Sequence, residues 1–232
     1  MKKVIFILII IIVSTFSCVK KEEDSFYVTG GPTIDRTHHF PVDTLGTDVC
    51  TLSIEICADP IYDSLTVNLN GEILTDLSVE DNVTTFTRTI STNMVEYDLE
   101  IESNLGNASA ICSMPGPFKI PEPDSLWIIP AQDCRIRWEK AANAQWYQVD
   151  IAWFDTIYPY QNNGDTTLYF NDTSLITIKG NNISFYGTMI VLVTAGNGAR
   201  LLPGDKGNIE GDANGYWVAR SKTRRAIKIG YW

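Results

Sequence analysis

The sequence predicts an all-β protein: two tandem β-sandwiches that follow a signal peptide and a flexible tether. Three observations support this fold class. Short runs of alternating apolar and polar residues recur from residue 47 onward with turn residues between them. No segment of this part repeats with a helical period. The chain of 232 residues also exceeds the common domain size of about 100 to 150 residues.

The first element is a signal peptide over residues 1–17. Lys2 and Lys3 precede an apolar run of 13 residues that extends from Val4 to Phe16. A permanent membrane span needs about 20 apolar residues. A basic start with a short apolar core is typical of an export signal.

The residues that end this run, Ser17 and Cys18, resemble the lipobox of bacterial lipoproteins, in which a cysteine after a small residue is diacylated and begins the mature chain. Thr15 and Phe16 depart from the commonest box, so ordinary cleavage beside an unmodified cysteine is the alternative. The resemblance implies lipid attachment at Cys18. It also implies a membrane partner through that anchor and an outer-membrane location.

The predicted tether covers residues 18–32. Its charged start, residues 20–24, has no apolar side chain and should be solvated. The same run is similar to surface-export signals of some gram-negative lipoproteins. Outward display and a periplasm-facing anchor both fit it.

The first predicted sandwich covers residues 33–117. Alternating strands are expected at 47–57, 65–69, 84–90, 95–103 and 108–113, and Asn70-Gly71 predicts a tight hairpin. Residues 97–108 resemble the late hairpin of immunoglobulin-like modules. An immunoglobulin-like sandwich is therefore expected here.

The second predicted sandwich covers residues 118–232. Four prolines between residues 114 and 123 mark a stiff connector and the domain boundary. Downstream, residues at the expected places of core strands resemble a fibronectin type III domain: Trp138, Tyr147, Val191, Val193, Ala195 and Asn197. Met189 departs from this family, which has a corner-forming tyrosine at that position.

Charge and cysteine content limit the partners and the crosslinks. Loss of the signal peptide removes two lysines and no acid, which takes the formal net charge from −10 to −12. Nucleic acid is therefore excluded as a partner, because it requires a basic footprint. Export allows disulfides, and a Cys50–Cys112 bridge is expected, with Cys57 and Cys134 as a second pair; four buried thiols are the alternative.

Aromatic residues supply the first candidate ligand site. Trp153, Tyr158 and Tyr160 flank a polar loop, and Trp217 extends the set. Such rings stack on sugars, while neighbouring amides and carboxylates bond to hydroxyl groups. The alternative is that these rings pack in the sandwich cores.

A calcium loop is the second candidate site. Its oxygen ligands would be Asp205, Glu210, Asp212 and Asn214, but the closing position falls on Ser221 rather than on a glutamate. A polar hairpin loop is the alternative. No other cofactor is expected.

Three basic residues alternate near the C-terminus: Arg220, Lys222 and Arg224. On an edge strand they would share one face and block aggregation. The alternative is a surface for an anionic glycan, a lipid head group or an acidic partner.

Catalytic groups are sparse in this sequence. The two histidines, His38 and His39, are neighbours and would point to opposite faces of a strand. No nucleophile motif or phosphate loop is present. The prediction is a non-enzymatic binding, adhesion or scaffolding module at the cell envelope, with an envelope protein or a polysaccharide as partner. A carbohydrate-binding surface lipoprotein of a glycan uptake system and a hydrolase with an unrecognised site are the alternatives.

Overall fold

The computed structural model describes residues 25–36, 48–59, 63–123, 127–155, 166–171, 173–183, 187–200 and 207–230. The predicted signal peptide and Cys18 lie outside these ranges, so lipid attachment at Cys18 stays a prediction. The described residues are almost all strand and turn, with one short 3-10 helix, η1 (Gly180–Asn182). None of these residues belongs to a helix that could span a membrane. The predicted all-β fold class is confirmed.

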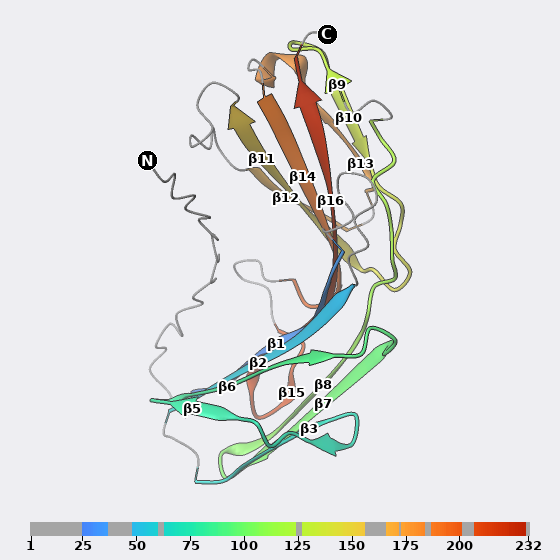
Figure 1. The fold of residues 1–232 in the computed structure, drawn as a ribbon. Coiled ribbons are helices and arrows are strands. Elements are labelled where there is room, and N and C mark those ends of the chain that lie inside the picture. Colours follow the sequence, from blue (N-terminus) through green and yellow to red (C-terminus); the bar gives the residue numbers. More distant parts are fainter. Residues whose placement is uncertain are drawn as a thin grey trace, which may run out of the picture.

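Three sheets contain the described strands (Figure 1). The nine-stranded sheet contains β1 (Ser25–Asp35), β2 (Val49–Asp59), β5 (Ser78–Glu80), β6 (Val83–Ile90), β9 (Trp127–Ile128), β11 (Trp146–Asp155), β12 (Thr166–Phe170), β14 (Gly187–Gly198) and β16 (Asn214–Ile229). The five-stranded sheet contains β3 (Leu65–Leu69), β4 (Glu72–Ile73), β7 (Glu96–Ser103), β8 (Gly106–Ser113) and β15 (Glu210–Gly211). The third sheet pairs β10 (Cys134–Arg137) with β13 (Leu175–Ile178).

The hairpin predicted at Asn70-Gly71 is confirmed. β3 occupies the expected residues, and β4 returns beside it with Leu69 opposite Glu72. Asn70 and Gly71 have φ angles of 51° and 82°. A type I′ turn requires positive φ at both central positions, which asparagine and glycine tolerate best.

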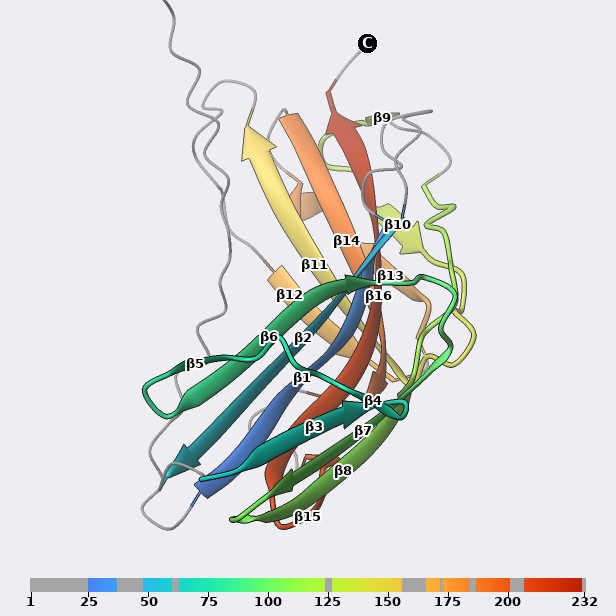
Figure 2. The ribbon, with the colours of Figure 1, turned by 60° about the horizontal axis from the view of Figure 1, so that its bottom comes forward.

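The first sandwich forms where the β16-β1-β2-β6-β5 part of the large sheet packs on the five-stranded sheet (Figure 2). Alternating residues of both sheets meet in one core, which includes Leu52, Phe86, Tyr97, Leu99 and Trp217. Period-two burial is what the alternating sequence predicts, because successive side chains of a strand point to opposite faces.

The second sandwich places the β12-β11-β14-β16 part of the large sheet over the β10–β13 pair. This strand arrangement is fibronectin type III-like. Of the residues that carried the resemblance, five are buried in the second core: Trp138, Tyr147, Val191, Val193 and Ala195. Met189, in place of the corner tyrosine, is fully buried. Asp133 ties the approach to this corner, since its carboxylate accepts hydrogen bonds from the Gly180 amide and the Lys179 ammonium, each at 2.8 Å.

β16 belongs to both sandwiches. It pairs in parallel with β1 from Asn214 to Lys222 and antiparallel with β14 from Val218 to Ile229. Trp217 lies in the first core, whereas Ile229 lies in the second. Figure 1 shows this strand running from the lower sandwich into the upper one. The first sandwich therefore includes residues far beyond the boundary predicted at residue 117.

Two expectations from the sequence are wrong at this point of the fold. Residues 25–32, assigned to the tether, lie in β1, where Phe26 and Val28 enter the first core. The strand that carries Arg220, Lys222 and Arg224 is interior rather than an edge, because it has strand partners on both sides. Its basic residues therefore do not protect a sheet edge.

The proline-rich connector packs against the sandwiches instead of standing free. Met114 lies in the first core, while Phe118 and Ile120 lie in the second. The Arg225 guanidinium donates hydrogen bonds to the carbonyl oxygens of Ile120 and Pro123. The chain thus passes from the first sandwich into the second twice, once through this connector and once through β16.

Candidate binding surfaces

The two described tryptophans of the predicted aromatic site are buried in the sandwich cores. Trp153 is 9% exposed and lies in the second core, and Trp217 is fully buried in the first. The Trp217 indole donates a hydrogen bond of 3.0 Å to the Tyr97 carbonyl oxygen. Tyr158 and Tyr160 lie outside the described residues. Both tryptophans are core residues because they fall on inward-facing positions of β11 and β16, and the ligand role assigned to them is wrong.

The expected Cys50–Cys112 disulfide is not formed. Both cysteines are buried free thiols, and so is Cys134, which excludes its pairing with Cys57. Cys50 belongs to the nine-stranded sheet and Cys112 to the five-stranded sheet. Tyr97 lies directly opposite Cys112 on β7, and its hydroxyl approaches the Cys50 sulfur at 3.8 Å. The tyrosine ring therefore occupies the space between the sheets beside Cys50.

The buried thiols are poor nucleophiles. Burial raises the pKa of Cys112 from 9.0 to about 12 and that of Cys134 from 9.0 to about 11. Burial also raises the pKa of Cys50, against a smaller opposing effect of the Tyr97 hydroxyl. Since the thiolate is the reactive form, none of these cysteines is activated for catalysis at neutral pH.

The predicted calcium ligands are partly described. Glu210, Asp212 and Asn214 are exposed, and Asp205 lies outside the described residues. Asp212 accepts a hydrogen bond of 2.9 Å from the Asn107 amide, which attaches this loop to the β7–β8 hairpin. Within the ranges described, no three histidine, cysteine, aspartate or glutamate residues are grouped to hold a metal. The calcium site stays a prediction.

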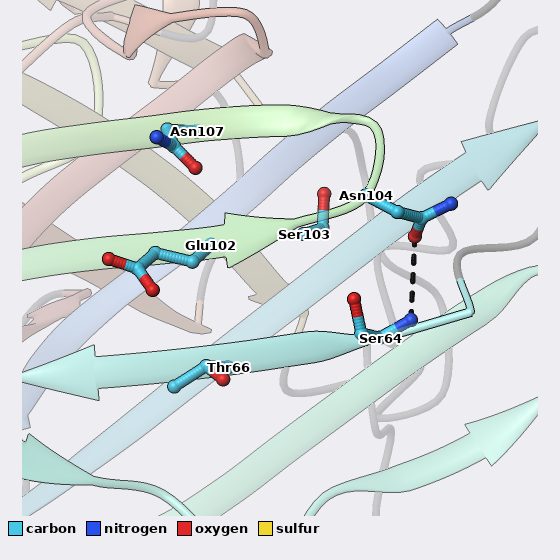
Figure 3. Close-up of a pocket in the computed structure, with 6 residues that line it drawn as sticks. All are labelled: Ser64, Thr66, Glu102, Ser103, Asn104 and Asn107. Carbon is cyan, nitrogen blue, oxygen red and sulfur yellow. Dashed lines mark hydrogen bonds between the residues drawn. The ribbon is translucent and has the colours of Figure 1, made fainter.

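Two adjoining hollows lie on the outer face of the five-stranded sheet. The first is lined by Ser64, Thr66, Glu102, Ser103, Asn104 and Asn107 (Figure 3). The second continues from Glu102 and Asn107 along β8 to Glu210. The Asn104 side-chain oxygen accepts hydrogen bonds from the amides of Asp63 and Ser64 at 2.8 and 3.4 Å. These hollows are open and lined by hydroxyl, amide and carboxylate groups, unlike the apolar enclosed pockets that hold small ligands.

An acidic row crosses the same outer face. Four acidic residues alternate along β7 while the residues between them enter the first core: Glu96, Asp98, Glu100 and Glu102. None of their carboxylates makes a hydrogen bond or an ion pair with a described residue. The described strands of this sheet contain no lysine or arginine. The alternation of acids along residues 96–102 is the sequence pattern that indicates this row.

A cationic row lies on the outer face of the nine-stranded sheet. Arg220, Lys222 and Arg224 alternate along β16, with Ser221 between them turned into the interior. Arg220 and Lys222 are half-buried, and Arg224 is exposed. The row crosses the level at which the two sandwiches join. The five-stranded sheet thus presents an acidic face, whereas the nine-stranded sheet carries a cationic row with Asp35 and Asp150 on nearby strands.

Comparison with known proteins identifies no family for this chain. No protein-family model matches the sequence, and no curated protein is similar to it. Three solved bacterial structures share weak similarity. Trypsin-activated alpha-2-macroglobulin from Escherichia coli has 8% identity and a TM-score of 0.27, over 88% of this chain and 15% of that one.

The other two structures are similar at the same level. The Yersinia pseudotuberculosis adhesin InvE has 8% identity and a TM-score of 0.26, over 91% of this chain and 62% of that one. The fibronectin(III)-like modules of Clostridium thermocellum CbhA have 10% identity and a TM-score of 0.25, over 77% and 86%. The fold assignment rests on the strand pairing of this chain itself, because similarity at this level carries no functional argument.

Proposed function

We propose that this protein is a lipid-anchored, non-enzymatic binding, adhesion or scaffolding module of the bacterial cell envelope. One observation carries the proposal: the described residues form an acidic sheet face with two open hollows, and a row of cations on β16 that makes no ion pair with a described residue. Catalysis requires a positioned nucleophile, acid or base in a site that excludes water. Open sheet faces instead favour contact with an extended partner.

The anchor is tested by metabolic labelling with radioactive palmitate in a bacterial host. Lipidation at Cys18 gives a protein labelled with palmitate, and Cys18→Ser abolishes the label. An intact-mass measurement distinguishes a diacylated Cys18 from a free or disulfide-bonded cysteine. An unlabelled, soluble mature protein would overturn the anchor while leaving the binding function open.

The binding function is tested with the Cys18→Ser chain, which lacks an anchor of its own. We expect this chain to co-sediment with isolated cell envelopes. Prior digestion of the envelopes with protease removes a protein partner, and periodate oxidation removes a polysaccharide partner. Failure to co-sediment, combined with turnover of an ester, glycoside or peptide substrate, would replace the binding module by the hydrolase alternative.

The carbohydrate-binding alternative needs a different site from the one predicted around Trp153. That tryptophan is a core residue, so Trp153→Ala would report on stability and not on sugar binding. The cationic row on β16 supplies other chemistry for a glycan, and its neighbours are polar and aromatic.

A further inference from the structure

The cationic row of β16 has no counter-ion among the described residues. Arg220, Lys222 and Arg224 make no hydrogen bond or ion pair with any described residue, although the first two are half-buried. A guanidinium carries five N–H donors, and loss of water without a replacement acceptor is unfavourable. Such cationic donors can form charge-assisted hydrogen bonds with the oxyanion of a ligand.

The pKa shifts of Arg220 and Lys222 are those of cations without a close counter-ion. Burial is the largest cause that lowers the pKa of Arg220. The pKa of Lys222 is lowered first by burial and then by the neighbouring Arg220, against the opposing effects of Asp35 and Asp150. Asp35 lies directly opposite Lys222 in the β1–β16 ladder, and within the described structure neither acid comes within ion-pair distance of the row. The Asp150 carboxylate already accepts hydrogen bonds from the Gln148 amide at 2.9 and 3.0 Å and from a threonine hydroxyl of β12 at 2.8 Å.

Polar and aromatic groups line the same face beside the cations. Pairing across four strands puts Tyr169, Gln148, Thr194 and Lys222 in one row, because residues opposite each other in a ladder share a face. Tyr169 is 38% exposed, and it lies close enough to Arg220 to oppose the lowering of the Arg220 pKa by burial.

A second row contains Trp146, Gly196 and Arg220. The Trp146 indole lies over Gly196, where an added Cβ atom would stand 2.1 Å from a ring carbon. The glycine therefore makes room for the ring on this face. Trp146 and Thr194 are themselves buried, at 5% and 3% exposed, so the accessible groups of this face are the cations and Tyr169, which suit an acidic sugar.

We propose that this face of β16, with Arg220, Lys222 and Arg224 as the charged contacts and Tyr169 as an aromatic contact, binds an anionic polysaccharide through its carboxylate or sulfate groups. The proposal rests on the proposed binding function and names its site and ligand class. A thin polysaccharide chain delivers single oxyanions to half-buried cations, whereas a flat protein surface reaches only Arg224. The mature chain has a net charge of −12, so it repels polyanions except where cations gather locally.

The test titrates the purified full chain with three polysaccharides at low salt by isothermal titration calorimetry. Alginate carries carboxylates, dextran sulfate carries sulfates, and dextran is neutral. We expect alginate, dextran sulfate or both to bind, with an affinity that falls as salt is added, and dextran not to bind. The pair of charged probes distinguishes the two oxyanion sources.

Variants locate the site. Arg220→Gln combined with Lys222→Gln should weaken binding about tenfold or more, since each removes a charge-assisted hydrogen bond. Arg88→Gln is the matched control, because Arg88 is an exposed cation of the same sheet whose only ion pair in the described structure is a 3.5 Å contact with Glu72. That control should change the affinity less than twofold. Tyr169→Ala changes no charge and should also weaken binding.

A fold check accompanies each variant by circular dichroism. If the double variant does not fold, Arg224→Gln and Tyr169→Ala decide the question, because both residues are exposed. Equal binding by wild type and these variants overturns the site. Binding of anionic vesicles or an acidic protein, without binding of either charged polysaccharide, overturns the ligand class. If the wild-type chain binds neither charged polysaccharide but still co-sediments with envelopes, this inference is refuted and the proposed function stands.

Discussion

The two sandwiches differ in how each is completed and in the charge that each carries. The second uses the chain from the connector through β14 and closes with the later half of β16, whereas the first closes with β1 beside the earlier half of β16. Residues 37–118 contain 13 acidic side chains and one basic one, while residues 119–232 contain 11 acidic and 12 basic side chains. The first sandwich is therefore an acidic body completed by a distant strand, and the second is close to neutral. Sequence order and structural unit therefore do not coincide in this protein.

Two core substitutions test whether the shared strand β16 makes the two sandwiches unfold together, and they should have the largest effects on stability. Trp217→Ala in the first core and Trp138→Ala in the second should each lower the free energy of unfolding by about 3 to 5 kcal/mol. Because β16 runs through both cores, we expect one cooperative transition in urea that both variants shift. Circular dichroism and tryptophan fluorescence measure it, and Arg224→Ala is the exposed control on the same strand. Two separate transitions, each shifted by only one variant, would show that the sandwiches unfold independently.

A smaller effect tests the β1–β16 contact that closes the first sandwich. Gly215 has a φ of +140°, and an added Cβ would lie 1.7 Å from the Val28 carbonyl oxygen. Gly215→Ala should therefore separate the strands and cost more than Gly71→Ala, whose turn is open and whose penalty is roughly 1 to 2 kcal/mol from the left-handed backbone alone. Thermal unfolding compares the two variants. Equal losses would show that β1 does not depend on close approach to β16.

The loop that leads into β16 should contribute about 1 kcal/mol. Asp212→Ala removes the acceptor for the Asn107 amide at the end of the five-stranded sheet. Glu100→Ala is the matched control, since it removes an unpaired acid of the same face and relieves repulsion. We expect urea unfolding to show a loss for the first variant and no loss for the second. Stabilisation of the wild type by calcium, absent in Asp212→Ala, would instead support the predicted metal site.

The last comparison concerns the thiols of the two sandwiches at alkaline pH. A thiol whose pKa is raised in the folded state stabilises the protein fully below its ordinary value of 9.0 and loses that contribution as the pH rises toward the folded value. Cys112 should make the first sandwich lose stability up to a pH of about 12, and Cys134 the second up to about 11. Cys112→Ala should flatten the decline more than Cys134→Ala. Rapid alkylation of either native cysteine at pH 8, followed by peptide mass spectrometry, would show that they are not buried as described.

Local pattern predicted the strands well, because alternation and turn chemistry act between neighbouring residues. The hairpin at Asn70-Gly71 and the burial of Trp138 follow from such patterns. The pairing of β1 with β16 could not be predicted in this way, since it joins residues from opposite ends of the chain. The interior position of β16 depends on the same pairing, so the edge-strand role expected for Arg220, Lys222 and Arg224 could not be tested from local pattern alone.

Candidate sites were harder to predict than strands. The expected disulfide depended on which groups fill the space between two sheets, and Tyr97 fills it beside Cys50. The alternation of Arg220, Lys222 and Arg224 was visible in the sequence, but its neighbours Tyr169 and Gln148 come from other strands. Only the register across four strands shows that these groups lie on one face.

The parallel pairing of β1 with β16 also determines how the molecule would carry a mechanical load. Tension between the start of β1 and the end of β16 runs along both strands in opposite senses and places their ladder in shear. Hydrogen bonds loaded in shear resist together, whereas bonds loaded at one end open one after another. Tension applied between these two ends would therefore be resisted first by the β1–β16 ladder.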